Sequence, residues 1–136
     1  MEKSPTPVPV VAVALRDAGG RLLMQQCLAH KRHGGMWEFP GGKVEQLEEQ
    51  RVALCREVFE ELGLELAPEA LEPAGMAEEA AREGRPGLVL NLYTSTHWQG
   101  NPHGREGQRW GWFTLAEAAE LDLPPMDRAL LEGLSG

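Results

Sequence analysis

The segment from residue 42 to residue 64 constrains the fold more than any other part of the chain. At about 100° per residue, a helix places the carboxylates of Glu57, Glu60 and Glu61 within one arc of about 100°. The opposite arc is apolar, and Gly63 follows as a glycine at the end of a helix does. The side chains expected on the buried arc are Cys55, Val58, Phe59 and Leu62. We therefore expect a helix over residues 48–62 that packs on one side and presents acids on the other.

A glycine-rich turn precedes this helix. Residues 38–43 read Glu-Phe-Pro-Gly-Gly-Lys, and glycine lets backbone groups come close to a bound group because it has no Cβ. Three carboxylates and a backbone carbonyl are the oxygen ligands that a hard divalent cation such as Mg²⁺ prefers, with substrate phosphates completing its coordination. The alternative is an ordinary solvated acidic face, which many surface helices carry.

The spacing of these residues resembles the Nudix hydrolase signature, G-x5-E-x7-R-E-U-x-E-E-x-G-U, where U is aliphatic. All nine constrained positions are filled without a gap, by Gly42, Glu48, Arg56, Glu57, Val58, Glu60, Glu61, Gly63 and Leu64. The runs WEFPGGKVE and WQGNPHGREGQRWGWFTLAEAAELDLPPMD extend the resemblance over nearly the whole chain, and they are most similar to the MutT branch of nucleoside triphosphate pyrophosphohydrolases.

The resemblance implies a set of site residues. The metal ligands would be the carbonyl of Gly41 and the carboxylates of Glu57, Glu60, Glu61 and Glu106, binding Mg²⁺, with Mn²⁺ as the alternative. Glu106 lies in a glycine-rich loop, so the alternative is that its carboxylate is simply solvated.

Catalytic roles follow from the same resemblance. Glu57, Glu61 and Glu106 are the candidates for general base, and the sequence does not choose between them. Arg56 and Glu48 are expected to brace the ligands, as outer groups do at metal sites. Their alternatives are a surface ion pair for Arg56 and a helix-starting acid for Glu48.

Three residues are expected to bind substrate. Asp127, after the Pro-Pro pair, would face the base and accept hydrogen bonds from the cytosine amine, from guanine N1 and N2, or from N7-H of 8-oxoguanine. It could instead be a helix N-terminal acid. Phe39 could stack on the base or belong to the core. Lys43, the last residue of the glycine-rich turn, is the third residue expected to bind substrate.

Two positions depart from the family pattern. Many members have an arginine after the second strand that reaches substrate phosphate, whereas this chain has Cys27 and Leu28, so that contact is lost unless Lys31 or Arg32 replaces it. Leu47 stands where a glycine before the signature glutamate is frequent, and it could change the loop.

The remaining pattern predicts an α/β fold, a Nudix-type α/β/α sandwich with a mixed β-sheet, as a single domain over residues 1–136. Strands are expected at residues 8–15, 21–27, 88–95 and 110–113, and loops at residues 78–87 and 97–108. A helix capped by Thr114 is expected to run to about residue 120, and a last helix over residues 126–134.

Composition limits the function classes. A net charge of −8 argues against a nucleic-acid polymer as partner, since such binding depends on clustered Lys and Arg. The apolar N-terminal run is too short for a membrane span and lacks the layout of a secretion signal. The two cysteines, Cys27 and Cys55, are interpreted as reduced core thiols of a cytoplasmic protein. The protein is expected to be a monomer or a homodimer.

Taken together, the resemblance implies an Mg²⁺-dependent enzyme that hydrolyses nucleoside triphosphates to the monophosphate and pyrophosphate. It would remove oxidised or unwanted nucleotides, such as 8-oxo-dGTP or cytosine nucleotides. The alternatives are a hydrolase of ADP-ribose or dinucleoside polyphosphates, and a non-catalytic nucleotide sensor on the same scaffold.

Overall fold

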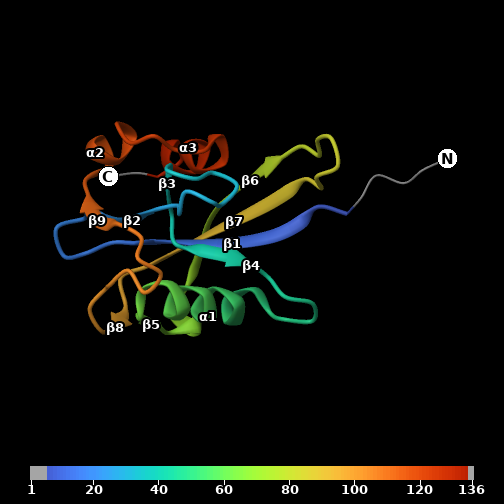
Figure 1. Ribbon diagram of the computed structural model, residues 1–136. Coiled ribbons are helices and arrows are strands. Elements are labelled where there is room, and N and C mark those ends of the chain that lie inside the picture. Colours follow the sequence, from blue (N-terminus) through green and yellow to red (C-terminus); the bar gives the residue numbers. More distant parts are fainter. Residues whose placement is uncertain (1–5, 135–136) are drawn as a thin grey trace.

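The computed structural model describes residues 6–134, and Figure 1 shows strands between helices on two sides. The elements in chain order are β1 (Val8–Leu15), β2 (Leu22–Gln26), β3 (Trp37–Glu38), β4 (Gly41–Lys43), α1 (Gln50–Leu62), β5 (Glu65–Leu66), the short 3-10 helix η1 (Pro68–Ala70), β6 (Glu72–Glu79), β7 (Leu88–Ser95), β8 (Trp98–Gln99), β9 (Trp110–Phe113), α2 (Leu115–Ala119) and α3 (Pro125–Glu132). The predicted α/β/α sandwich is confirmed, with α1 on one side of the strands and α2 and α3 on the other.

The central sheet is mixed. Its strand order is β4-β1-β7-β6, with β1 parallel to β7 and the other two pairs antiparallel. A second sheet has the order β3-β2-β9, and β5 pairs with β8. Strand β1 lies inside the sheet and is buried on both faces, which accounts for its continuous apolar sequence.

Alternation along β1 divides the core in two. Val11, Val13 and Leu15 face the hydrophobic cluster under α1, whereas Ala12 and Ala14 face the cluster that α3 covers. The glycine-rich turn is attached to β1 directly, because β4 pairs with it in the register Val11 to Gly42. The sheet therefore holds the turn at a fixed position next to α1.

Helix α1 differs in detail from its prediction. It begins at Gln50, with Glu49 as N-cap accepting a hydrogen bond from the Val52 backbone, so Glu48 lies outside the helix. Gly63 ends it at φ 74°, as expected. Phe59 was expected on the buried face, and this prediction is wrong: the buried residues are Ala53, Leu54, Val58 and Leu62. Phe59 is 43% exposed, since the buried stripe runs along positions 54, 58 and 62 and leaves residue 59 at its edge.

The predicted loop at residues 78–87 is partly wrong. Strand β6 continues to Glu79, where it still pairs with Leu88 of β7. Its sequence contains Pro73 and Gly75 and is mostly exposed, because β6 is an edge strand, so it lacks the apolar alternation that marks a strand. The strands at residues 8–15, 88–95 and 110–113 are confirmed, as is the Thr114 cap, which forms a capping box with Glu117.

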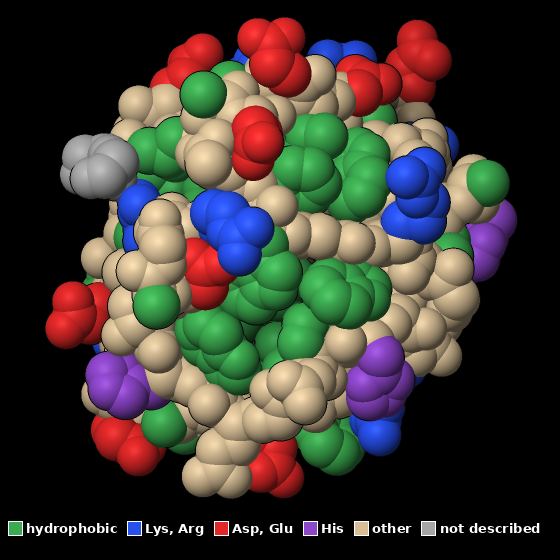
Figure 2. Space-filling model, turned by 90° about the vertical axis from the view of Figure 1, so that its left-hand side faces the viewer, with side chains coloured by type: hydrophobic (Ala, Val, Ile, Leu, Met, Phe, Trp, Pro, Cys, Tyr) green, Lys and Arg blue, Asp and Glu red, His purple; other side chains and the backbone are tan. Residues whose placement is uncertain are grey.

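Figure 2 shows the face at the left of Figure 1, where hydrophobic side chains gather near the centre and Lys and Arg are scattered singly. Among the described side chains, this face carries no continuous basic stripe of the kind that follows a nucleic-acid backbone. Within residues 6–134, no helix has the length and apolarity that crossing a membrane requires.

Leu47 has a left-handed backbone conformation, with φ 65°, and its side chain is fully exposed. In this conformation a residue with a Cβ lowers the folding stability by about 1–2 kcal/mol. Glycine lowers it by about 0.5–1 kcal/mol, because its unfolded chain is more flexible. We expect Leu47→Gly to raise the free energy of unfolding by about 0.5–1 kcal/mol in urea titrations. Leu47→Ala, which keeps the Cβ, is the control and should show no such gain. Equal stability of the two variants would contradict the strain assigned to this residue.

Candidate functional site

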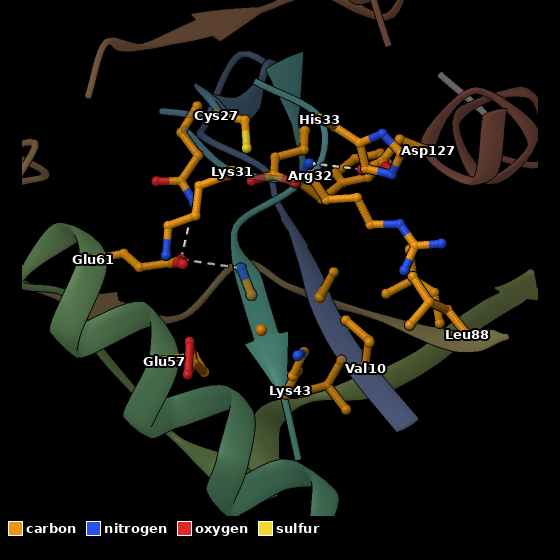
Figure 3. Close-up of a pocket in the computed structure, with 18 of the residues that line it drawn as sticks. Val10, Cys27, Lys31, Arg32, His33, Lys43, Glu57, Glu61, Leu88 and Asp127 are labelled. Atoms are coloured by element: carbon orange, nitrogen blue, oxygen red, sulfur yellow. Dashed lines mark hydrogen bonds between the residues drawn. The ribbon is translucent and has the colours of Figure 1, made fainter. Parts of the chain in front are cut away.

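A cavity of about 700 Å³ brings most of the predicted site residues together. Its wall includes side chains or backbone of β1, β2, β3, β4, α1 and α3, and of the segments around residues 31–33 and 106–108. In Figure 3, Glu57 and Lys43 lie around one end of the cavity, and Cys27 and Asp127 around the other. The predicted residues that line it are Phe39, Gly41, Lys43, Glu57, Glu60, Glu61, Glu106 and Asp127.

The turn at Gly41 and Gly42 accepts no larger residue without movement. A Cβ on Gly41 would lie 2.0 Å from the carbonyl oxygen of Val11, and the φ of Gly41 is 155°. A Cβ on Gly42 would lie 2.1 Å from a carboxylate oxygen of Glu57. The glycines thus let the turn pack against β1 on one side and bring the Glu57 carboxylate against its backbone on the other.

Glu61 is held by two donors. Its Oε1 accepts hydrogen bonds from the Gln25 side-chain amide at 2.9 Å and from the Gly41 backbone N–H at 3.2 Å. Burial, with the nearby Glu57 and Glu38 carboxylates, raises the pKa of Glu61 to about 8 despite these bonds. Burial is also the main cause that raises the pKa of Glu57. At Glu57 the Arg56 guanidinium opposes this effect without cancelling it.

Two buried glutamines connect Glu61 to the segment that carries Glu106. Gln108 donates through Nε2 to Gln25 Oε1 and to the Glu61 carbonyl, each at 2.9 Å, and its Oε1 accepts from the Glu106 backbone N–H at 3.0 Å. Since Gln25 in turn donates to Glu61, every bond fixes the orientation of the next amide. These hydrogen bonds of Gln25 and Gln108, called here the glutamine relay, hold Glu106 at the cavity beside α1.

Sequence reasoning did not find this relay. Gln25 and Gln108 are 3% and 8% exposed, so they are buried polar groups whose partners are distant in the sequence. The signal available was Gln25 itself, a polar residue that directly follows the apolar start of β2.

Arg56 joins three acids beside the cavity. It donates through Nε and Nη2 to Glu48 at 2.8 and 2.9 Å, and through Nη1 to Glu57 at 3.0 Å and Glu60 at 3.5 Å. Glu48 also accepts from the Glu45 backbone N–H, so it fixes the start of α1 without being part of the helix. The contacts expected of bracing residues are present, and their effect on a bound metal stays a prediction.

The donor set fits a hard divalent cation. Glu57, Glu60 and Glu61 supply only oxygen, as the Gly41 carbonyl would, and all four residues line one cavity. Within residues 6–134, however, no three His, Cys, Asp or Glu side chains converge closely enough to enclose an ion. Arg56 holds Glu57 and Glu60, while Gln25 and Gly41 hold Glu61. Each of these bonds uses one oxygen of its carboxylate and leaves the other without a hydrogen-bond partner among residues 6–134. Binding a cation therefore requires the carboxylates to move closer together, and the assignment stays a prediction.

The other end of the cavity contains Asp127, which is 5% exposed and lies in the first turn of α3. Its Oδ2 accepts a hydrogen bond from the Phe39 backbone N–H at 3.1 Å. Phe39 lines the cavity but is only 3% exposed and packs in the α3-side core, which leaves little of its ring for stacking on a base. The prediction that Cys27 is a core thiol is wrong, because it is half-buried and lines the cavity.

Lys31 and Arg32, the two possible replacements for the missing arginine, have different surroundings in the structure. Arg32 donates to the Glu79 carboxylate of β6 and is held there. Lys31 and Lys43 line the cavity, and neither forms an ion pair with any acid of residues 6–134. Figure 3 shows Lys31 extending to the side of the cavity where Glu61 lies.

Comparison with known proteins places the chain in a family. Residues 6–134 match the NUDIX domain. The chain is 36% identical to a CTP pyrophosphohydrolase of Escherichia coli over 90% of its own length and 87% of that protein's. It is 35% identical to a putative 8-oxo-dGTP diphosphatase 2 of Mycobacterium tuberculosis, covering 86% of this chain and 81% of the relative.

Solved structures agree with this placement. The solution structure of the E. coli ORF135 protein superposes with a TM-score of 0.80 at 32% identity, covering 94% of this chain and 88% of that one. A MutT NUDIX hydrolase from Burkholderia pseudomallei has a TM-score of 0.80 at 28% identity, covering 96% of this chain and all of the other. The chain belongs to the Nudix family. Within it, the protein is a MutT-like Nudix hydrolase, an enzyme that acts on phosphorus-containing anhydrides.

The Glu48–Arg56 pair predicts a pH dependence of stability. The Arg56 guanidinium and the Glu45 N–H lower the pKa of Glu48 from 4.5 to about 2. A lowered pKa in the folded protein means that the pair stabilises fully above pH 4.5 and loses its effect as the pH falls toward 2. We expect Glu48→Gln to be less stable than the parent at neutral pH, with the difference shrinking across this acid range in chemical unfolding. A difference that stays constant with pH would refute the ion pair as its source.

Proposed function

We propose that the protein is an Mg²⁺-dependent nucleoside triphosphate pyrophosphohydrolase that removes oxidised or unwanted nucleotides. The observation that carries the proposal is one cavity with oxygen donors at one end and Asp127 at the other. A triphosphate with its cation suits the first end, and a base suits the second. The names of the relatives, a CTP pyrophosphohydrolase and 8-oxo-dGTP diphosphatases, support this substrate class.

The proposed reaction is substitution by water at the β-phosphorus. A bond forms between the water oxygen and the β-phosphorus, and the bond from that phosphorus to the α–β bridging oxygen breaks. The products are the nucleoside monophosphate and pyrophosphate, and the water proton passes to a carboxylate. A divalent cation, when bound, neutralises phosphate oxygens and lowers the pKa of bound water.

The residues of the chain supply position and proton transfer. Glu57, Glu60, Glu61 and the Gly41 carbonyl would hold the cation, and Glu106 would join them from the segment fixed by the glutamine relay. Lys31 and Lys43 would approach the phosphates, since both line the cavity while Arg32 is held by Glu79. The general base is one of Glu57, Glu61 and Glu106, each of which lines the cavity.

Glu57→Gln and Glu61→Gln should each lower kcat by roughly 100-fold or more, because the amide can neither take the proton nor hold the cation as a carboxylate does. The measurement is the formation of nucleotide products with Mg²⁺, separated by chromatography, across CTP, dCTP, 8-oxo-dGTP, dinucleoside polyphosphates and ADP-ribose, together with pyrophosphate release from the triphosphates. Glu65→Gln, an exposed glutamate outside the cavity, is the control and should keep parental turnover.

This panel separates the proposal from its alternatives. Nucleotide products from ADP-ribose or dinucleoside polyphosphates alone would replace the triphosphate assignment. Nucleotide binding without the formation of any product would indicate a sensor. Near-parental turnover in both variants would show that the metal site is wrongly assigned.

Gly42→Ala tests the geometry of Glu57. The added Cβ would lie 2.1 Å from the Glu57 carboxylate, so that side chain must move, while the backbone φ of Gly42 is accessible to alanine. We expect roughly tenfold or greater loss of kcat/KM, with thermal unfolding little changed. Gly19→Ala is the matched control, because its Cβ would make only an ordinary contact of 3.5 Å with Asp17. A fully active Gly42→Ala enzyme would show that Glu57 need not occupy this position.

A further inference from the structure

The last turn of α1 contains acids but no basic residue of its own. Glu60 and Glu61 lie in this turn, and a negative charge at the C-terminal end of a helix opposes the helix dipole. The last four backbone carbonyls of a helix also have no partner within it. A cation and hydrogen-bond donors from another segment of the chain would therefore stabilise this end of α1.

The loop of residues 100–109, between β8 and β9, supplies such groups, and Figure 1 shows it beside the end of α1. The His103 backbone N–H donates to the Leu62 carbonyl at 3.1 Å. The Arg105 backbone N–H donates to the Glu61 carbonyl at 3.0 Å. Gly63 permits this close approach, since a Cβ there would lie 2.6 Å from the His103 ring. The loop is thus attached to α1 through its backbone.

The Arg105 side chain contacts one residue of α1 twice. Its Nη1 donates to the Phe59 carbonyl at 3.0 Å, and its guanidinium carbon lies 4.7 Å from the centre of the Phe59 ring. A cation over an aromatic face is attracted by the ring, and a positive charge at this end of a helix also matches the dipole. Among residues 6–134 Arg105 forms no ion pair. These contacts give the exposed Phe59 ring a role outside the core.

The position of Glu106 depends on this attachment. Glu106 directly follows Arg105 and lines the cavity, where its carboxylate forms no ion pair with any group of residues 6–134. Its backbone N–H is held by Gln108, and the residue before it is held by α1. The backbone on both sides of Glu106, rather than a contact of its own carboxylate, therefore determines where that carboxylate lies.

We propose that Arg105 is a positioning residue, which holds the loop 100–109 on the end of α1 through Phe59 and thereby keeps Glu106 at the cavity. This inference rests on the proposed function, in which Glu106 is a metal ligand or the general base. Arg105 does not line the cavity, so it would act through Glu106 and not on the substrate. Gln108, which is buried, fixes the loop from the inside, and the exposed Arg105 fixes it from the outside.

Hydrogen exchange of the metal-free protein tests the attachment without using activity. In Arg105→Gln, the backbone N–H groups of residues 103, 105 and 106 should exchange roughly tenfold faster, because the loop opens more often when a cation–π contact and a hydrogen bond are lost. Arg109→Gln is the matched control, since it also removes an exposed guanidinium that lies over an aromatic ring, that of Trp37. It should leave these three exchange rates at parental values, and neither variant should change those of β1.

Two substitutions of Phe59 test the aromatic contact. Phe59→Leu removes the ring and should reproduce part of the faster loop exchange, while leucine, a strong helix former, leaves α1 intact. Phe59→Tyr keeps the ring face and should match the parent. Parental exchange rates in Phe59→Leu would show that the ring does not hold the loop.

A double-substitution cycle tests whether Arg105 acts through Glu106. With the triphosphate that the parent hydrolyses fastest, Arg105→Gln should lower kcat by roughly tenfold, and by no more than Glu106→Gln does. Adding Arg105→Gln to Glu106→Gln should cause no further loss, because the carboxylate that it positions is already absent. Arg109→Gln should keep the parental kcat.

Three further results would overturn the proposal. The first is loop exchange that Arg105→Gln leaves unchanged, and the second is parental kcat in Arg105→Gln or Glu106→Gln. The third is a double variant much slower than Glu106→Gln, which would mean that Arg105 acts on another group. Failure of the proposed function is a different result, namely a parent that forms no nucleotide product from any triphosphate.

Discussion

The close packing of the turn at Gly41 and Gly42 between β1 and α1 is the constraint on which the site depends. The sheet fixes one side of the turn through the β1–β4 pairing, and the Glu57 side chain occupies the space beside Gly42 on the other. Backbone and carboxylates approach this closely only because neither glycine has a Cβ. The same approach lets the Gly41 N–H reach Glu61, so one turn positions two of the proposed ligands.

Sequence reasoning succeeded where the determinants are local or follow a fixed spacing. The strand Val8–Leu15, the Thr114 cap and the Gly63 end of α1 each depend on residues close together in the chain. It failed where tertiary contacts decide. Phe59 has the spacing of a core residue, yet the direction in which α1 packs leaves it at the edge. Strand β6 is mostly exposed and lacks apolar alternation, so only its pairing with β7 identifies it as a strand.

The site residues likewise divide into those that spacing predicts and those that only tertiary contacts reveal. Spacing predicted that Glu57, Glu60 and Glu61 share one wall, and the cavity contains all three. Spacing could not predict the relay of Gln25 and Gln108, since 83 residues separate the partners of its central hydrogen bond. Nor could it distinguish Lys31 from Arg32, because the acid that holds Arg32 lies in β6, the strand that the pattern did not reveal.

Acidic side chains line both ends of the cavity. At the end beside α1, where a cation is proposed, the carboxylates would have to be ionised to hold it, and burial raises the pKa of both Glu57 and Glu61. The cation would therefore stabilise the charge that the fold disfavours. At the other end, backbone N–H bonds favour the ionised form of Asp127, while burial and the Asp127 charge raise the pKa of Glu38 to about 7. Both ends are thus built from the same kind of side chain, and at both of them burial opposes its charge.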